Sequence, residues 1–397
     1  MSSIELRKFL FGTVIWSIGN QMVTVTQTYV IFDITKSSLQ LAILGAAVVV
    51  TSVSMSLASG ILADRLSRKT LLMCGSVATA SSMFAVGLLI ITDQIEPWHI
   101  QVAGGVHGAA LALDWTARFS LIPNMVHRNI LARAVFFDNT FFNLGRVLAP
   151  LMWGGIVQFW GYEWTYFTIA GVMTLNFVVV ATYRPLSSTV GAAHQAIWHD
   201  VMEIATVIRS NSILKGNLIF TFVNALLMGG FIYLLTPIAR EVYNVGAGEY
   251  SQLFASIGIG AFVGGLFLGL SGGFKRTGYA LLTTNVLSAG FAIAFAFVAS
   301  FYFGFGFALM FGLIGAIHIG LGSISLQMAI TDNVRGRLAG IYEVAWAGFP
   351  LGGFVFGAMA EPLGSSNSLM IGCIFVIVVT ISIGAFNPQL RRLRMRL

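Results

Sequence analysis

Charged side chains interrupt several long apolar stretches of this 397-residue sequence. The charged residues that lie inside these stretches are Asp114, Arg118, Asp138, Arg146 and Glu343. A charge at the centre of a membrane span costs about 2.5–3.5 kcal/mol on insertion scales, so each of them needs a partner or a function. Carboxyl groups in such places can exchange protons, and guanidinium groups can bind anions. We find no Ser/His/Asp set and no metal-ligand spacing, so neither an enzyme, a cofactor nor a bound metal is expected.

The three acidic residues of this set, Asp114, Asp138 and Glu343, are the candidates for proton coupling. Asp114 and Arg118 are four residues apart, so on a helix they share one face and can form a direct ion pair. Such a pair can also be purely structural, because it neutralises two buried charges. Glu343 lies about two turns inside its apolar stretch, and its alternative role is to pair with an arginine of a nearby loop.

A polar stripe marks the stretch that contains Asp138. Asn139, Asn143 and Arg146 follow one another at spacings of four and three, so they share a helix face, about 100° from Asp138. This face must point to a cavity or to a neighbouring helix, since it cannot face lipid. Arg146 can then bind an anionic group of a substrate, or be held by Asp138 or Asp114.

Other residues are candidates for the wall of the same cavity. The first apolar stretch presents neutral polar groups on one helical face, and these serve either a wet cavity or contacts between helices. A histidine such as His318 is either a packing residue or a proton shuttle. The further cavity candidates are Asn20, Gln21, Thr24, Phe142, Trp346 and His318.

The composition indicates the elements that must hold these residues. With 57% hydrophobic and 9% charged residues, the chain cannot form a soluble surface. Its apolar runs are continuous and long enough for membrane helices of about 20 residues each. We therefore predict an all-α membrane protein with spans at 9–33, 39–63, 70–92, 98–122, 133–158, 164–184, 213–238, 248–271, 278–299, 302–327, 337–360 and 367–386. Glycines at intervals of four, as at Gly260 and Gly264, predict close packing between these helices.

The predicted spans form two sets of six. The expected parts are an N-terminal bundle at 1–184, a cytoplasmic linker with an amphipathic helix at 185–212, and a C-terminal bundle with a basic tail at 213–397. Similar segments recur about 204 residues apart, which indicates a duplication. Most Lys and Arg residues fall on one side of this layout, so both termini are expected in the cytoplasm. The Lys and Arg residues are distributed according to the side of the membrane on which each loop lies, and they do not cluster into a nucleic-acid-binding surface.

A charged loop separates the second and third predicted spans. Its sequence, Gly60-Ile-Leu-Ala-Asp64-Arg65-Leu-Ser67-Arg68-Lys69, resembles the loop signature of the major facilitator superfamily of transporters, with Ser67 where that family usually has Gly. The resemblance implies twelve membrane helices in two pseudo-symmetric bundles. It also implies a gate latch formed by Gly60, Asp64, Arg65, Arg68 and Arg118.

Segments farther along resemble the macrolide-efflux and enterobactin-exporter branch of that superfamily. They include Asp114, Ala117 and Arg118, with Thr116 in place of a usual proline. An antiporter pattern in the fifth span is kept only partly, because Trp153 stands where a small residue is usual.

This resemblance implies a monomeric transporter of the bacterial inner membrane that exports a small amphipathic or hydrophobic molecule, such as a drug, macrolide or siderophore, in exchange for protons. The alternatives are uptake or lipid flipping by the same fold, or a receptor that does not transport.

Overall fold

The computed structural model describes residues 3–125, 131–183, 211–271, 274–328 and 345–393, and every regular element in these ranges is a helix. The expected all-α class is therefore confirmed for the described part of the chain. Two compact units are distinguished, one made of Met1–Ala192 with Val245–Ala255, and the other of Ala193–Asn244 with Ser256–Leu397. The predicted linker at 185–212 lies almost entirely outside the described residues.

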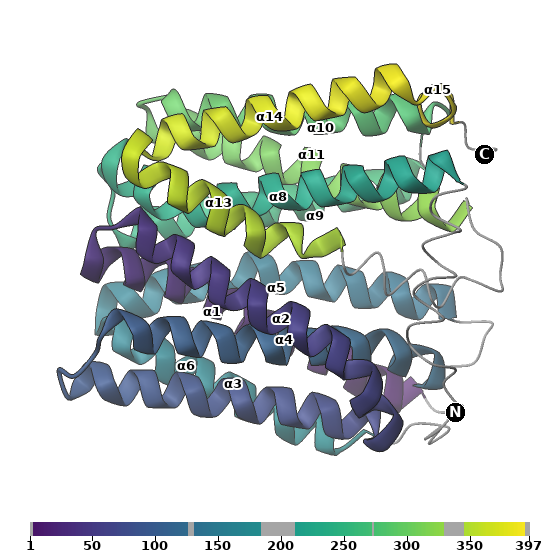
Figure 1. Ribbon diagram of the computed structural model, residues 1–397. Helices are drawn as coiled ribbons and strands as arrows, with labels where there is room; N and C mark the ends of the chain where they lie inside the picture. The colour runs from purple at the N-terminus through teal and green to yellow at the C-terminus, as the bar shows by residue number, and fades with distance from the viewer. Residues whose placement is uncertain (1–2, 126–130, 184–210, 272–273, 329–344, 394–397) are drawn as a thin grey trace. The chain divides into compact units, whose positions relative to one another are not determined.

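The first unit contains long helices that pack side by side (Figure 1). They are α1 (Ser3–Thr35), α2 (Ser38–Arg65), α3 (Arg68–Ile91), α4 (Pro97–Met125), α5 (Leu131–Trp160) and α6 (Tyr162–Ala181). Helix α1 packs on α5 and α6, α3 packs on α4 and α6, and α2 packs on α4. This arrangement brings α1, α4 and α5 together, and these are the helices on which most candidate site residues lie.

The second unit holds a corresponding set. Its helices are α8 (Ser212–Glu241), α9 (Ala247–Ser271), α10 (Thr277–Phe297), α11 (Phe301–Met328), α13 (Gly348–Leu363), α14 (Ser365–Phe386) and the short α15 (Pro388–Arg391), with the first residues of α9 assigned to the first unit. Helix α8 packs on α13 and α14, and α10 packs on α11 and α14. These neighbours repeat, in the same chain order, four pairs of the first unit, α1 with α5 and α6 and α3 with α4 and α6.

Each predicted span corresponds to one of these long helices, although the start of the span at 337–360 lies outside the described residues. Eight helices of the described part are long and apolar enough to cross a membrane. The long helices outside this set are α1, α4, α5 and α13. The first three carry the polar and charged side chains of the candidate site, and α13 is only 16 residues long.

Glycines allow the helices of the second unit to approach closely, as their spacing predicts. A Cβ atom on Gly229 of α8 would lie 1.7 Å from the carbonyl oxygen of Phe349, and one on Gly352 of α13 would lie 2.0 Å from that of Leu226. Helices α9 and α11 meet in the same way at Gly260, where a Cβ would lie 2.0 Å from the carbonyl oxygen of Leu309. The α8–α13 contact is therefore a contact of backbone with backbone.

The loop between α2 and α3 is short, and Ser67 has a clear structural role in it. This serine is the N-cap of α3, and its hydroxyl accepts a hydrogen bond from the Thr70 N–H at 3.1 Å. Lys69 donates from Nζ to the carbonyl oxygens of Ala181, at 2.5 Å, and Tyr183, at 3.2 Å. It thereby satisfies carbonyl groups at and just after the C-terminus of α6, where a positive charge is favourable. The serine that departs from the family pattern is thus explained as a helix cap.

Candidate functional site

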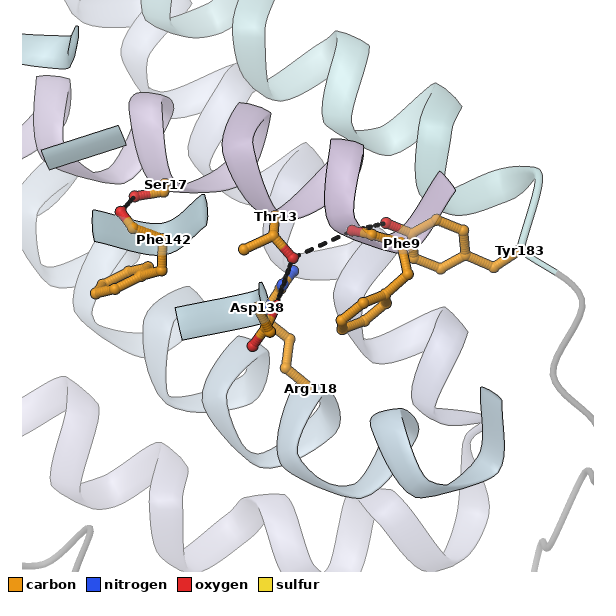
Figure 2. A network of polar contacts seen from close by, with 7 residues as sticks. All are labelled: Phe9, Thr13, Ser17, Arg118, Asp138, Phe142 and Tyr183. Carbon is orange, nitrogen blue, oxygen red and sulfur yellow. Dashed lines mark hydrogen bonds and ion pairs between the residues drawn. The ribbon is translucent and has the colours of Figure 1, made fainter. Parts of the chain in front are cut away.

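Arg118 of α4 is the centre of a buried polar network in the first unit (Figure 2). Its side chain is only 4% exposed, and its Nη2 forms an ion pair with Oδ1 of Asp138 on α5 at 3.0 Å. The same nitrogen donates to the hydroxyl of Thr13 on α1. One guanidinium group therefore joins three helices, α1, α4 and α5.

Thr13 completes the network. Its hydroxyl accepts from Arg118 and lies 2.6 Å from Oδ1 of Asp138 and 3.1 Å from the carbonyl oxygen of Phe9. Because a hydroxyl has only one proton, it can donate to one of these acceptors at a time. The shorter distance and the negative charge favour the carboxylate of Asp138.

Aromatic rings surround the guanidinium group. Its central carbon lies 4.8 Å from the ring centroid of Phe9 and 4.5 Å from that of Trp16, within the range of cation–π attraction. The Trp16 ring in turn packs against Trp115, at 5.2 Å, and Phe142, at 5.7 Å. Arg118 is thus held by one carboxylate, one hydroxyl and two rings, in a site with little access to water.

The expected direct ion pair between Asp114 and Arg118 is wrong. Within the described residues, Arg118 pairs with Asp138, whereas Oδ2 of Asp114 accepts a hydrogen bond from the indole N–H of Trp16 at 2.7 Å. The other oxygen, Oδ1, is buried without a hydrogen-bond partner in the described part, and a Cβ on Gly75 would lie 2.6 Å from it. Asp114 and Arg118 do share a helix face, but α1 supplies Trp16 as the partner of Asp114, and α5 supplies Asp138 as the ionic partner of Arg118.

Within the described residues around Arg118, Asp138 is the acid that is partly exposed. Its side chain is 17% exposed, whereas Asp114 is buried. Protonation would remove the negative charge opposite Arg118, so the network is chemically suited to couple a proton to the packing of three helices.

The polar stripe of α5 lies beside this network. Asn139 is exposed, and Asn143 and Arg146 are half-buried. The Asn143 amide donates to the backbone carbonyl of Asn139 at 2.9 Å. Arg146 is the sixteenth of the 30 residues of α5, and no described acidic side chain lies within ion-pair distance of it. Neither Asp138 nor Asp114, the partners that the sequence suggested, pairs with it.

The polar face of α1 is mostly satisfied within its own helix or by α5. The Asn20 amide is buried and donates to the carbonyl oxygen of Trp16 at 2.8 Å, and the Thr24 hydroxyl lies 3.3 Å from the Asn20 carbonyl oxygen. Ser17 donates to the carbonyl oxygen of Phe142 at 2.6 Å, which attaches α1 to α5 (Figure 2). Gln21 is half-buried.

The remaining candidates fall into different surroundings. His318 is buried in the second unit, and its Nδ1 lies 3.0 Å from the Thr284 hydroxyl, so it has a partner between α11 and α10. Trp346 is half-buried just before α13, and Arg68 is half-buried at the start of α3. Glu343 lies outside the described residues, as do the side chains of Asp64 and Arg65 and the surroundings of Gly60. The latch and the Glu343 site remain predictions.

Sequence reasoning missed Thr13 and the role of Trp16. Thr13 lies four, seven and eleven residues before Ser17, Asn20 and Thr24, so extending the polar face of the first span by one turn would have found it. Trp16 is not among the candidate residues of the sequence, yet its indole N–H makes the hydrogen bond to Asp114. In the described part, no three His, Cys, Asp or Glu side chains could hold a metal ion.

Comparison with protein families gives a match over nearly the whole chain. Residues 4–393 match the family described as transmembrane secretion effector. The enterobactin exporter EntS of Citrobacter koseri is 24% identical over 344 residues, which cover 84% of this chain and 80% of the relative. The enterobactin exporter EntS of Salmonella typhi is 23% identical over 350 residues, with the same coverage.

Solved structures share the fold at low sequence identity. A D-xylose-proton symporter has a TM-score of 0.78 at 12% identity and covers 99% of this chain and 100% of its own. A bacterial homologue of the human lysosomal transporter Spinster, in an inward-facing and occupied conformation, has a TM-score of 0.75 at 13% identity. The match covers 99% of this chain and 98% of the homologue. At these identities the likeness concerns the fold alone.

Proposed function

Because the chain belongs to the transmembrane secretion effector family of the major facilitator superfamily, we propose that it exports a small amphipathic or hydrophobic organic molecule by proton-coupled alternating access. The resemblance found in the sequence is confirmed by this membership. The chain is a multi-pass integral membrane protein of a transporter family, not an enzyme. Relatives named as enterobactin exporters support export and make siderophores the first substrate class to test, beside drugs and macrolides.

The proposal includes the predicted topology. Twelve spans in two bundles would place both termini in the cytoplasm of a bacterial inner-membrane protein that acts as a monomer. The correspondence between the predicted spans and the long helices supports this layout, as does the repeated order of helix neighbours in the two units. The concentration of Lys and Arg residues in the loops on one side of the predicted spans indicates that this side faces the cytoplasm.

The observation that carries the proposal is the ion pair between Arg118 and Asp138. With the Asp138 carboxylate charged, Arg118 and Thr13 hold α1, α4 and α5 together. Protonation of Asp138 would remove its charge and leave the buried guanidinium without an ionic partner, a costly state. The protonated bundle would then favour a conformation in which these helices separate, and a proton would shift the equilibrium between the two access states.

Arg146 is suited to hold an anionic group of the substrate. It lies in the middle of α5, and Asp138 and Asp114, the acids that the sequence suggested as its partners, are bonded to Arg118, Thr13 or Trp16 instead. A half-buried guanidinium group without a carboxylate gains strongly from an anion that supplies two oxygens. Asn139 and Asn143, on the same face, would add neutral hydrogen-bonding groups.

Transport into proteoliposomes with an imposed pH gradient tests this function, with enterobactin as the first probe. An acidic interior should drive accumulation if protons leave as substrate enters. Asp138→Asn should abolish this accumulation and keep exchange of labelled for unlabelled substrate without a gradient. Asp114→Asn is the matched control and should keep both activities. If Asp138→Asn retains gradient-driven accumulation, coupling at Asp138 is wrong, and Glu343→Gln becomes the variant that locates it.

Uptake is the second candidate because one residue departs from the antiporter pattern. Trp153 is fully buried in α5, with its ring centroid 4.9 Å from that of Tyr29 on α1, at a place where the family pattern has a small residue. The large ring changes how α5 can bend against α1. Accumulation driven by an acidic exterior instead of an acidic interior would identify proton symport and refute export by antiport.

A further inference from the structure

A basic cavity lies at one end of the second unit, away from the residues used above. It has a volume of about 490 Å³ and is lined by Arg276, Tyr279, Arg391, Arg392 and Leu393. The first two residues belong to the start of α10, and the other three to α15 and the residues just after it. The cavity therefore joins two segments that lie more than a hundred residues apart in the sequence.

The chain holds these segments together by backbone contacts. The Gly278 N–H donates to the carbonyl oxygen of Leu393 at 3.2 Å, and a Cβ on Gly278 would lie 1.9 Å from the carbonyl oxygen of Leu390. Asn387 caps α15 by accepting from the Leu390 N–H at 3.0 Å, and its amide donates to the carbonyl oxygen of Ser212 at 2.7 Å. The arginines thus project from a fixed scaffold that ties α8, α10 and α15 together.

The cavity carries positive charge that no described acid balances. Three of its five lining residues are arginines. The acidic residues of the second unit that the structure describes are Glu241, at the C-terminus of α8, and Glu361, near the C-terminus of α13. Both lie at the opposite end of the helices from α15, since α8 begins at the Ser212 contact and α14 separates Glu361 from α15. Three guanidinium groups gathered without a carboxylate form a site for an anion.

The guanidinium group of Arg391 has a hydrogen-bond donor that is not satisfied within the described part of the chain. The Nε atom of Arg391 is buried and has no hydrogen-bond partner in the described part of the chain. A buried donor without a partner is costly, and an oxygen of an anion in the cavity would satisfy it.

The surroundings of the cavity match the level of lipid headgroups. The segment that carries Arg391, Arg392 and Leu393 directly follows α14 in the chain, and α14 is one of the helices apolar enough to span the membrane. Phe386, the last residue of α14, is 88% exposed, and Tyr279 in the cavity wall is 46% exposed. Exposed aromatic side chains at the ends of membrane helices are typical of the interface between lipid tails and water.

We propose that this cavity binds a phosphate group, and that its occupant is the headgroup of an anionic phospholipid. The glycerol phosphate diester of such a lipid presents two acceptor oxygens to Arg276, Arg391 and Arg392. Its acyl chains continue along the apolar surface of α10 and α14. A lipid in this place joins the C-terminal segment to the start of α10.

Native mass spectrometry of the full-length protein in detergent, with added phosphatidylglycerol, tests the proposal. The wild type should keep one tightly bound phosphatidylglycerol, in preference to phosphatidylcholine. Arg391→Gln should weaken this binding by about tenfold or more, because a hydrogen bond to a charged group is lost. Arg391→Lys keeps the charge but loses the planar fork, so it should bind with intermediate affinity.

Lys275→Gln is the matched control, since Lys275 is an exposed neighbour of Arg276 that does not line the cavity. It removes the same charge and should lower the affinity by at most about fivefold, the effect of one surface base near an anionic membrane. Equal losses in Lys275→Gln and Arg391→Gln would overturn the cavity in favour of a diffuse basic surface. Competition by millimolar inorganic phosphate or glycerol 3-phosphate as effective as the lipid would overturn the lipid as occupant.

Discussion

Replacing Asp138 by asparagine is the most direct test of the network in Figure 2. The change removes one negative charge and leaves the size of the side chain almost unchanged. Removing one partner of a fully buried ion pair typically costs about 3–5 kcal/mol. Here the side chain of Asp138 is 17% exposed, and Arg118 keeps its contacts with Thr13, Phe9 and Trp16. We therefore expect a loss of about 2–3 kcal/mol.

The loss can be measured as a thermal shift of the purified protein in detergent. For a unit of 150–250 residues, each kcal/mol corresponds to about 2–4 °C, so the melting temperature should fall by roughly 5–10 °C. Asp114→Asn makes the same chemical change one helical turn from Arg118. Its amide oxygen can still accept from the Trp16 indole, and the expected loss is at most about 1 kcal/mol.

The comparison of these two variants decides which acid is the partner of Arg118. If Asp114→Asn destabilises the protein as much as Asp138→Asn, or more, the described network is wrong. A double-mutant cycle with Arg118→Gln gives a second measure. The variants at Arg118 and Asp138 should show a coupling energy of about 2 kcal/mol, whereas Arg118 and Asp114 should be nearly additive.

Three further predictions concern local features. Thr13→Val keeps the shape but removes the hydroxyl between Arg118 and Asp138, so stability should fall by about 1–2 kcal/mol in the same thermal assay, and no fall would refute that hydrogen bond. Ser67→Ala should lower stability by about 1 kcal/mol, and Ser67→Gly by only a few tenths, because both lose the cap of α3 but glycine is itself tolerated there. Gly229→Ala should cost about 3 kcal/mol or more, or prevent folding, because the added methyl group meets the Phe349 carbonyl. The control Gly265→Ala places its methyl group where nothing lies within 4 Å, so it should be neutral or slightly stabilising. Equal yields of monodisperse protein from the two variants would contradict this.

The helices could be predicted from the sequence because their signal is local. Each span is a mostly apolar run bounded by charged or turn-forming residues. Most helix ends of the structure lie within a few residues of the predicted ones, as in α9 (Ala247–Ser271) for the span at 248–271, whereas α1 begins six residues before its predicted span. The requirement that every backbone group be satisfied inside lipid leaves few alternatives to a helix.

The partners of the charged residues could not be predicted in the same way. Helical spacing shows that Asp114 and Arg118 share a face, but it does not show which neighbouring helix covers that face. Asp138 comes from another helix, and Thr13 lies 105 residues away from Arg118. These partners compete successfully with the local pair, and only the packing of α1 and α5 against α4 decides between them.

Glycine shows the same limit at a smaller scale. The repeated spacing predicts a close contact, and Gly264 does face a backbone carbonyl, that of Leu313. Its neighbour Gly265 has open space where a Cβ would be. Spacing alone cannot separate the two, because the orientation of a helix is set by its neighbours.

The contact between α8 and α13 has a mechanical consequence. At Gly229 and Gly352 the main chains touch without intervening side chains, so there is no layer of rotamers that can rearrange when the protein moves. The two helices are therefore expected to translate and tilt together as one rigid body. Any ligand that displaces either helix displaces the other by the same amount, and bending within this bundle has to occur along other helix pairs.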